Sequence, residues 1–198
     1  SITGQKTVEN RENPAAENEF TFGWFTEDDE PVMTDDNDYI VTSGGKQLTA
    51  STQEGGDFTL NTPMYTQENI GEIYTYYVKE IVPTTQDPSI TYDTDAIEVT
   101  VAITDAGNGK LNVSVTTPDL NDNDVLAFEN IYNASGTWVP RAQKTVTGRE
   151  DVPSIFTFKL YDKEGKEIDE ATNNGSTITF DAITYGLEDA GKEFEYIV

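Results

Sequence analysis

Apolar and polar residues alternate with a period of two along several short stretches of this chain. The clearest stretch is 74–82, and the pattern returns at 97–103 and 111–115, on either side of a Gly-rich turn at 105–109. Such alternation places successive side chains on opposite faces of a β-strand, and the turn composition is that of a hairpin. No helical period persists over three turns, and residues 66–71 are a candidate for a short helical turn. The chain is therefore predicted to be all-β, with further strands near 2–8, 19–25, 57–61 and 125–132.

The two halves of the chain repeat each other. Gln5-Lys6-Thr7-Val8 recurs as Gln143-Lys144-Thr145-Val146, and residues 58–78 align without gaps with residues 178–198. About seven short strands separated by turns in each repeat predict tandem immunoglobulin-like Greek-key β-sandwich domains.

Domain boundaries follow from the repeat. We expect a complete module at residues 1–133, a short linker at 134–137 and the N-terminal part of a second module at 138–198. The second module is predicted to be incomplete, because nothing in it corresponds to residues 79–132. The first module has longer loops, mainly at 27–57.

Composition excludes several kinds of chemistry. The chain has 37 Asp and Glu against 12 Lys and Arg, a formal net charge of −25, and it has neither Cys nor His. This charge argues against binding nucleic acid or anionic lipid, since both need a positive surface. The sequence has no run of about 18 apolar residues, so we expect no membrane insertion in this segment. Without thiols and imidazoles we expect no disulfide, no Cys/His metal site and no cofactor. The acidic stretches 35–38 and 121–124 are candidates for Ca²⁺ binding, but we expect them to be solvated loops.

Three polar side chains fall on the inward faces of predicted strands. Lys6 shares a face with Ile2 and Val8, and Glu80 shares one with a row of Tyr and Val residues. Asn130 follows Leu126 and Phe128 on the inward face of the last predicted strand of module one. A lysine, a glutamate and an asparagine on three strands of one small domain form a pattern.

The three side chains can react with one another if they meet. Burial lowers the pKa of an amine, and a neutral amine is a nucleophile. Lys6 could attack the Asn130 carboxamide while Glu80 polarises the carbonyl and transfers protons, so that ammonia leaves and an isopeptide bond remains. The alternative from the pattern alone is a structural salt bridge between Lys6 and Glu80, or a lysine that reaches solvent at the rim.

The order and spacing of several motifs resemble the pilin isopeptide linkage domain, a family of tandem modules in Gram-positive pilins and adhesins. The motifs are Gln5-Lys6-Thr7-Val8, Phe20-Thr21-Phe22, Tyr76-Tyr77-Val78-Lys79-Glu80, Ile90-Thr91-Tyr92-Asp93 and Phe128-Glu129-Asn130-Ile131-Tyr132. The resemblance implies that Lys6 and Asn130 are joined and that Glu80 is the catalytic acid. In module two it implies that Lys144 is the reactive lysine, whose acid and asparagine would lie beyond Val198.

The resemblance also implies a function. We expect a stalk module of a bacterial cell-surface protein or pilus, extracellular and anchored to the cell wall through other parts of the protein. Its partners would be neighbouring repeats and, for module two, a complementing chain that supplies the missing strand. Such a module is not an enzyme, because the crosslink forms once. The alternative is an adhesin domain that binds a host glycan or matrix protein, with the 27–57 region as its surface.

Overall fold

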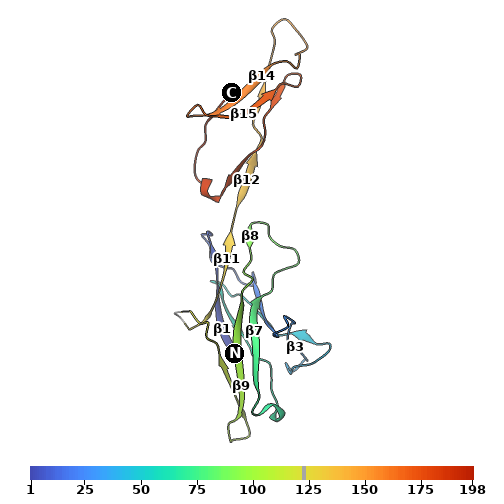
Figure 1. Cartoon of the computed structure of the whole chain (residues 1–198), viewed down its shortest axis with the longest axis vertical. Helices are drawn as coiled ribbons and strands as arrows, with labels where there is room; N and C mark the ends of the chain where they lie inside the picture. Colours follow the sequence, from blue (N-terminus) through green and yellow to red (C-terminus); the bar gives the residue numbers. More distant parts are fainter. Residues whose placement is uncertain (122–123) are drawn as a thin grey trace. The chain divides into compact units, whose positions relative to one another are not determined.

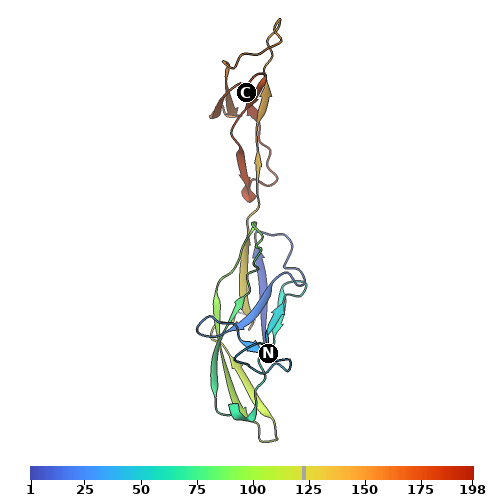
Figure 2. The same ribbon diagram turned by 90° about the vertical axis from the view of Figure 1, so that its right-hand side faces the viewer.

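The computed structural model describes residues 1–121 and 124–198, which form two compact units. Unit 1 comprises Ser1–Tyr132 and unit 2 comprises Asn133–Val198; their strands are drawn in Figures 1 and 2. Apart from two short 3₁₀ turns, the regular structure of the described residues consists of strands, so the all-β prediction is confirmed. No described helix has the length and apolar composition needed to cross a membrane.

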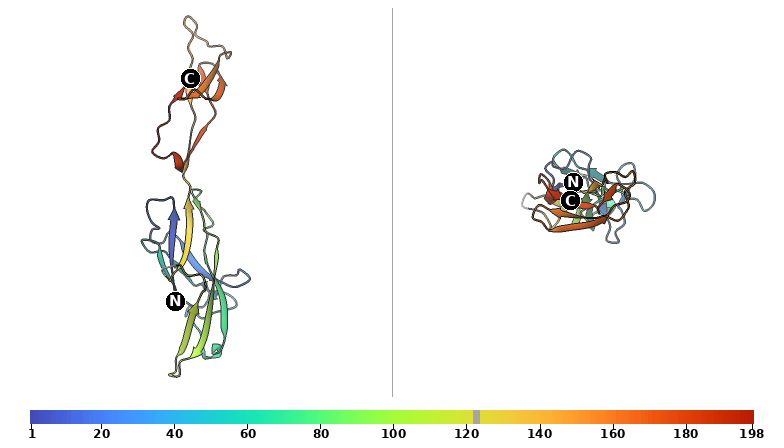
Figure 3. Two further views of the ribbon diagram at one scale, coloured as in Figure 1. Left: turned by 60° about the vertical axis from the view of Figure 1, so that its left-hand side comes forward. Right: turned by 90° about the horizontal axis from the view of Figure 1, so that it is seen from above.

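The first sheet of unit 1 joins the beginning of the unit to its end. Its four strands, in the order β6–β1–β11–β8, are β6 (Asp57–Leu60), β1 (Ile2–Glu9), β11 (Leu126–Tyr132) and β8 (Ile90–Thr91). β1 and β11 are parallel neighbours, seen side by side in Figure 3, with Lys6 opposite Phe128 and Val8 opposite Asn130. The other two pairings are antiparallel.

The second sheet of unit 1 is antiparallel throughout. Its five strands, in the order β10–β9–β7–β2–β5, are β10 (Leu111–Thr116), β9 (Ala96–Asp105), β7 (Ile73–Glu80), β2 (Thr21–Phe25) and β5 (Thr49–Ser51). The predicted turn at 105–109 connects β9 to β10. The region 27–57 also contains a small separate pair, β3 (Met33–Thr34) with β4 (Lys46–Gln47).

Aromatic side chains fill the space between the two sheets. Phe22 of β2 stacks on Phe58 of β6 with ring centroids 3.9 Å apart, and Phe128 of β11 lies 4.9 Å from Phe22. Trp24 is fully buried, and its indole N–H donates to the carbonyl of Asn61 at 2.7 Å. Burying each of these rings contributes about 2–3 kcal/mol, so the inward faces of the alternating strands hold the sandwich together.

Unit 2 is smaller and has three short sheets. They pair β12 (Ser135–Trp138) with β17 (Ile183–Gly186), β13 (Arg141–Gln143) with β16 (Thr177–Thr179), and β14 (Thr157–Asp162) with both β15 (Glu167–Thr172) and β18 (Tyr196–Ile197). Its buried apolar core consists of Leu160, Ile178 and Phe180.

The sequence repeat is also a structural repeat. The 3₁₀ turn η1 (Gln67–Asn69) of unit 1 corresponds to η2 (Leu187–Asp189) of unit 2, and η1 lies where a helical turn is predicted. Tyr65 and Tyr76 are joined through their hydroxyls at 3.4 Å, and their counterparts Tyr185 and Tyr196 are joined at 2.8 Å. Equivalent residues therefore make equivalent contacts in the two units.

The expected linker at 134–137 consists mostly of extended strand. Most of it belongs to β12, in which Ser135 pairs with Gly186 and Gly136 with Tyr185. The small residues that indicate a linker are equally compatible with an exposed strand. The partner strand lies about 50 residues away along the chain, so the local sequence does not indicate it.

Candidate crosslinking site

Three strands bring the predicted trio together inside unit 1. Lys6 lies on β1, Glu80 is the last residue of β7, and Asn130 lies on β11. Their exposed fractions are 1%, 5% and 0%, as the alternation predicts for inward-facing positions. β1 and β11 are neighbours in one sheet, whereas β7 belongs to the other sheet, so the carboxyl group approaches from across the core.

The three side chains form a closed set of hydrogen bonds. Lys6 Nζ donates to Glu80 Oε2 and to Asn130 Oδ1, both at 2.6 Å. Asn130 Nδ2 donates to Glu80 Oε1 at 3.1 Å. The predicted alternative, a Lys6–Glu80 salt bridge, is present as a contact, but the carboxamide bonds to both of its members. The amine, the acid and the amide are thus in mutual contact.

Burial and charge act in opposite directions on the amine. Removal from water lowers the pKa of Lys6, and this effect exceeds the opposing influence of Glu80 through its hydrogen bond and its charge. Lys6 Nζ also lies 5.4 Å from the centre of the Phe20 ring. The site therefore favours the neutral, nucleophilic form of this lysine more than water does.

The backbone around Lys6 depends on a glycine. The Lys6 N–H donates to the carbonyl of Gly56 at 2.8 Å. Gly56 has φ of +93°, and a Cβ at this position would lie 2.1 Å from the Lys6 carbonyl oxygen. A glycine is needed here both for the backbone conformation and for the close approach to β1.

We expect Gly56→Ala to destabilise unit 1 much more than Gly55→Ala does. Gly55 has nearly the same φ, +94°, but its added Cβ would meet nothing within 4 Å. Gly55→Ala should therefore cost about 1–2 kcal/mol for the left-handed backbone alone, while Gly56→Ala adds the collision with Lys6. Urea denaturation measures the difference, and equal losses for the two variants would contradict the role assigned to Gly56.

In unit 2 the backbone position of the predicted lysine is reproduced without its partners. The Lys144 N–H donates to the carbonyl of Ser176 at 2.8 Å, as Lys6 does to Gly56, and Lys144 Nζ lies 4.9 Å from the Phe156 ring. Among the described residues, no carboxylate forms an ion pair with Lys144.

The remaining predicted candidates lie elsewhere. In the acidic stretch 35–38, Asp35 Oδ1 accepts the N–H groups of Asn37 and Tyr39, and Asp38 pairs with Lys46 at 3.6 Å. Asp35 thus shapes a turn. Of the second stretch, residues 122 and 123 lie outside the described part of the chain.

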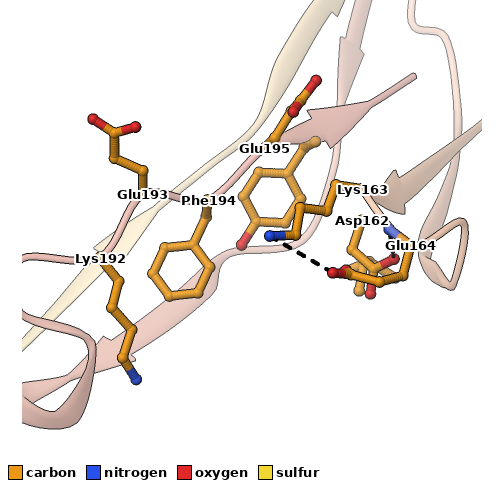
Figure 4. Close-up of a pocket in the computed structure, with 9 residues that line it drawn as sticks. Asp162, Lys163, Glu164, Lys192, Glu193, Phe194 and Glu195 are labelled. Atoms are coloured by element: carbon orange, nitrogen blue, oxygen red, sulfur yellow. Dashed lines mark hydrogen bonds and ion pairs between the residues drawn. The ribbon is translucent and has the colours of Figure 1, made fainter.

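Unit 2 also has a hollow of about 590 Å³, shown in Figure 4. Charged side chains of both signs, including the Lys163–Glu164 pair at 3.7 Å, line it beside Phe194. It contains none of the predicted reactive residues.

Two residues at the site have no individual role predicted from the sequence. One is Phe20, beneath the amine, and the other is Asp93, whose main-chain N–H donates to Asn130 Oδ1 at 2.6 Å. Both belong to the family motifs given above, Phe20-Thr21-Phe22 and Ile90-Thr91-Tyr92-Asp93. Those motifs are the sequence feature that could have indicated a role for the two residues.

The fold and the site define an all-β domain whose first and last strands meet beside a buried Lys–Glu–Asn cluster. The model of the FctA family, described as the Spy0128-like isopeptide containing domain, matches residues 2–133 and 140–198. The chain belongs to this family. No curated protein sequence matches the chain.

The solved structures that are similar to this chain include major pilins. The crystal structure of the major pilin from Streptococcus pyogenes is 14% identical, with a TM-score of 0.39, over 92% of this chain and 75% of that one. The T-13 major pilin of the same species is 17% identical, with the same TM-score and coverage. BcpA*(D312A), the major pilin subunit of Bacillus cereus, is 15% identical, with a TM-score of 0.34, over 92% of this chain and 52% of that one.

Proposed function

We propose that unit 1 is a stalk module of a bacterial pilus or cell-surface protein, stabilised by an autocatalytic isopeptide bond between Lys6 and Asn130 that Glu80 promotes. One observation carries the proposal: the buried amine, acid and amide contact one another at 2.6–3.1 Å. Membership of an isopeptide-containing family supports it. The module is then extracellular, and its partners are neighbouring subunits or repeats.

The contacts suggest a route for each proton. Glu80 Oε2 accepts a proton from Lys6 Nζ, and the resulting neutral amine attacks Cγ of Asn130. The protonated carboxyl group of Glu80 then turns about its Cγ–Cδ bond and delivers this proton to Asn130 Nδ2, which it already contacts through Oε1. The Cγ–Nδ2 bond breaks, ammonia leaves, and the Nζ–Cγ amide remains. One further proton from the original ammonium group stays on Glu80 or leaves with ammonia as ammonium, so atoms and charge balance.

The rate of this reaction comes from the fold. A side chain held against its reaction partner behaves as if present at about 10⁵ M or more, because the entropy of bringing the groups together has been lost during folding. Glu80 adds general acid–base catalysis. The reaction consumes its own residues, so we propose a single turnover and no external substrate.

A bond at this position suits a stalk. β1 and β11 are parallel neighbours, so the start of β1 and the end of β11 lie at opposite ends of this strand pair. Tension applied through the two ends of unit 1 would pass from β1 through the Lys6–Asn130 bond to β11. The strands between them would bear little of the load.

We expect the intact chain to weigh less than its sequence predicts by the mass of one ammonia. Tandem mass spectrometry of a protease digest should recover a branched peptide joining Lys6 to Asn130. Lys144→Ala should leave the loss unchanged, since Lys144 has no acid partner among the described residues. A chain of full mass would overturn the proposed function, and a second lost ammonia would contradict the assignment for unit 2.

A further inference from the structure

The Asn130 carboxamide oxygen has two hydrogen-bond donors among the described residues, and one of them leaves during the proposed reaction. The donors are Lys6 Nζ and the main-chain N–H of Asp93, both at 2.6 Å. When Nζ bonds to Cγ, it no longer lies in front of the oxygen as a donor. Negative charge then develops on Oδ1, and the Asp93 N–H is the donor that stays in place.

We infer that the main-chain N–H of Asp93 stabilises the oxyanion formed on Asn130 Oδ1, and that the Asp93 carboxylate is a positioning group that holds this N–H in place. The inference rests on the crosslinking proposed above. A preorganised N–H facing the oxygen that becomes negative is the arrangement that speeds acyl transfer elsewhere. No side-chain donor is needed, because the main chain supplies the group.

The Asp93 carboxylate fixes the position of the Asp93 main-chain N–H relative to β11. Its Oδ2 accepts the N–H of Glu129, the residue before Asn130 on β11, at 2.8 Å. Its Oδ1 accepts the N–H of Asp95 at 2.9 Å. The carboxylate therefore bonds through one oxygen to β11 and through the other to the segment that follows β8, which keeps the two together.

The same N–H also selects the orientation of the carboxamide. A main-chain N–H can only donate, so it requires the oxygen of Asn130 on its side. The Nδ2 group must then face Glu80 Oε1, so it contacts the carboxyl group that delivers a proton to the leaving group in the proposed route. Asp93 thus aligns the leaving ammonia with the acid before the reaction begins.

Charge alone predicts the opposite effect for this residue. The negative charge of Asp93 raises the pKa of Lys6 and so disfavours its neutral form, and the charge of Glu129 acts in the same direction. Removing a charge at either position should then speed the reaction slightly. If the N–H is the important group, removing the Asp93 carboxylate should slow it. Glu129→Gln is therefore a matched control, because it removes a charge and leaves the main-chain contacts intact.

The experiment measures the rate of ammonia loss in the full chain. The product of cell-free translation is held in urea, and folding is started by dilution. The intact mass is then recorded against time, and the folded fraction is followed by near-ultraviolet circular dichroism. Asp93→Pro removes the N–H itself and should slow the reaction about 100-fold or more. Asp93→Ala keeps the N–H but releases it, and should slow the reaction by a smaller factor, with partial recovery in Asp93→Asn. Glu129→Gln should react at least as fast as the native chain.

The outcomes separate the two proposals. If the native chain loses no ammonia, the proposed crosslink itself fails. If the native chain reacts but folded Asp93→Ala reacts equally fast or faster, the role of Asp93 is overturned while the crosslink stands. If Asp93→Pro does not fold, the rates of ammonia loss in Asp93→Ala and Glu129→Gln decide. The inference is rejected if Asp93→Ala reacts as fast as Glu129→Gln or faster.

Discussion

Glu80→Gln is expected to abolish ammonia loss on the timescale at which the native chain completes it. Glutamine has nearly the shape of glutamate and can still occupy the space between Lys6 and Asn130, but it cannot accept the proton of the amine. General acid–base catalysis by a positioned side chain is worth about 10²–10⁴ in rate. Intact mass after expression, and after prolonged incubation of the purified chain, measures the loss.

Two further variants complete this test. Glu80→Ala removes both oxygens and should also keep the full mass. Glu98→Gln makes the same change of charge at an exposed position on β9 and should lose its ammonia normally. The catalytic role of Glu80 would be refuted by a folded Glu80→Gln chain that matures as quickly as the native one.

Asn130→Ala is expected to lower the stability of unit 1 by the largest amount of any change considered. The bond closes a loop between residues that are 124 positions apart. Restricting the unfolded chain to this extent contributes about 4–5 kcal/mol in the loop-entropy description used for disulfides. The variant also leaves a buried Lys6–Glu80 pair without its amide partner. We expect the melting temperature of unit 1 to fall by roughly 10–20 °C.

Mechanical unfolding should also distinguish the native chain from Asn130→Ala, through the length of chain that is released. With the bond intact, the segment between Lys6 and Asn130 cannot be extended by pulling on the ends of unit 1. In Asn130→Ala this segment is released, adding roughly 400 Å of contour length at about 3.4 Å per residue. Asn112→Ala, at an exposed position on β10, is the control and should change neither quantity. Equal extension of the native chain and Asn130→Ala would show that no bond carries the load.

Much of the fold of unit 1 could be predicted because its strands are amphipathic. A period of two determines which side chains face inward, and the structure buries Lys6, Glu80 and Asn130 as that period requires. The hairpin at 105–109 and the short turn at 67–69 were also predictable, because glycines and capping residues act locally. Strand β8 and the pairing of β12 were not, because such short segments acquire their conformation from partners far away in sequence.

For Lys6, Glu80 and Asn130, too, only part of the site could be predicted from the sequence. Alternation predicts that the three side chains point inward, but it says nothing of whether they meet. Their contact requires β1 and β11 to be parallel neighbours and β7 to lie across the core. Asp93 is harder still to predict, since its contribution to the site is a main-chain N–H, which every residue except proline possesses.

From its residues alone, then, this chain reveals strands, a repeat, a family and three polar groups on inward faces, because these properties depend on neighbours close along the chain. Only the tertiary structure shows that those groups lie 2.6–3.1 Å apart. It also shows that Gly56 is needed for the close approach to β1 at Lys6, and that the Asp93 N–H faces the amide oxygen. These contacts depend on residues separated by up to 124 positions, and only packing of the two sheets brings such residues together.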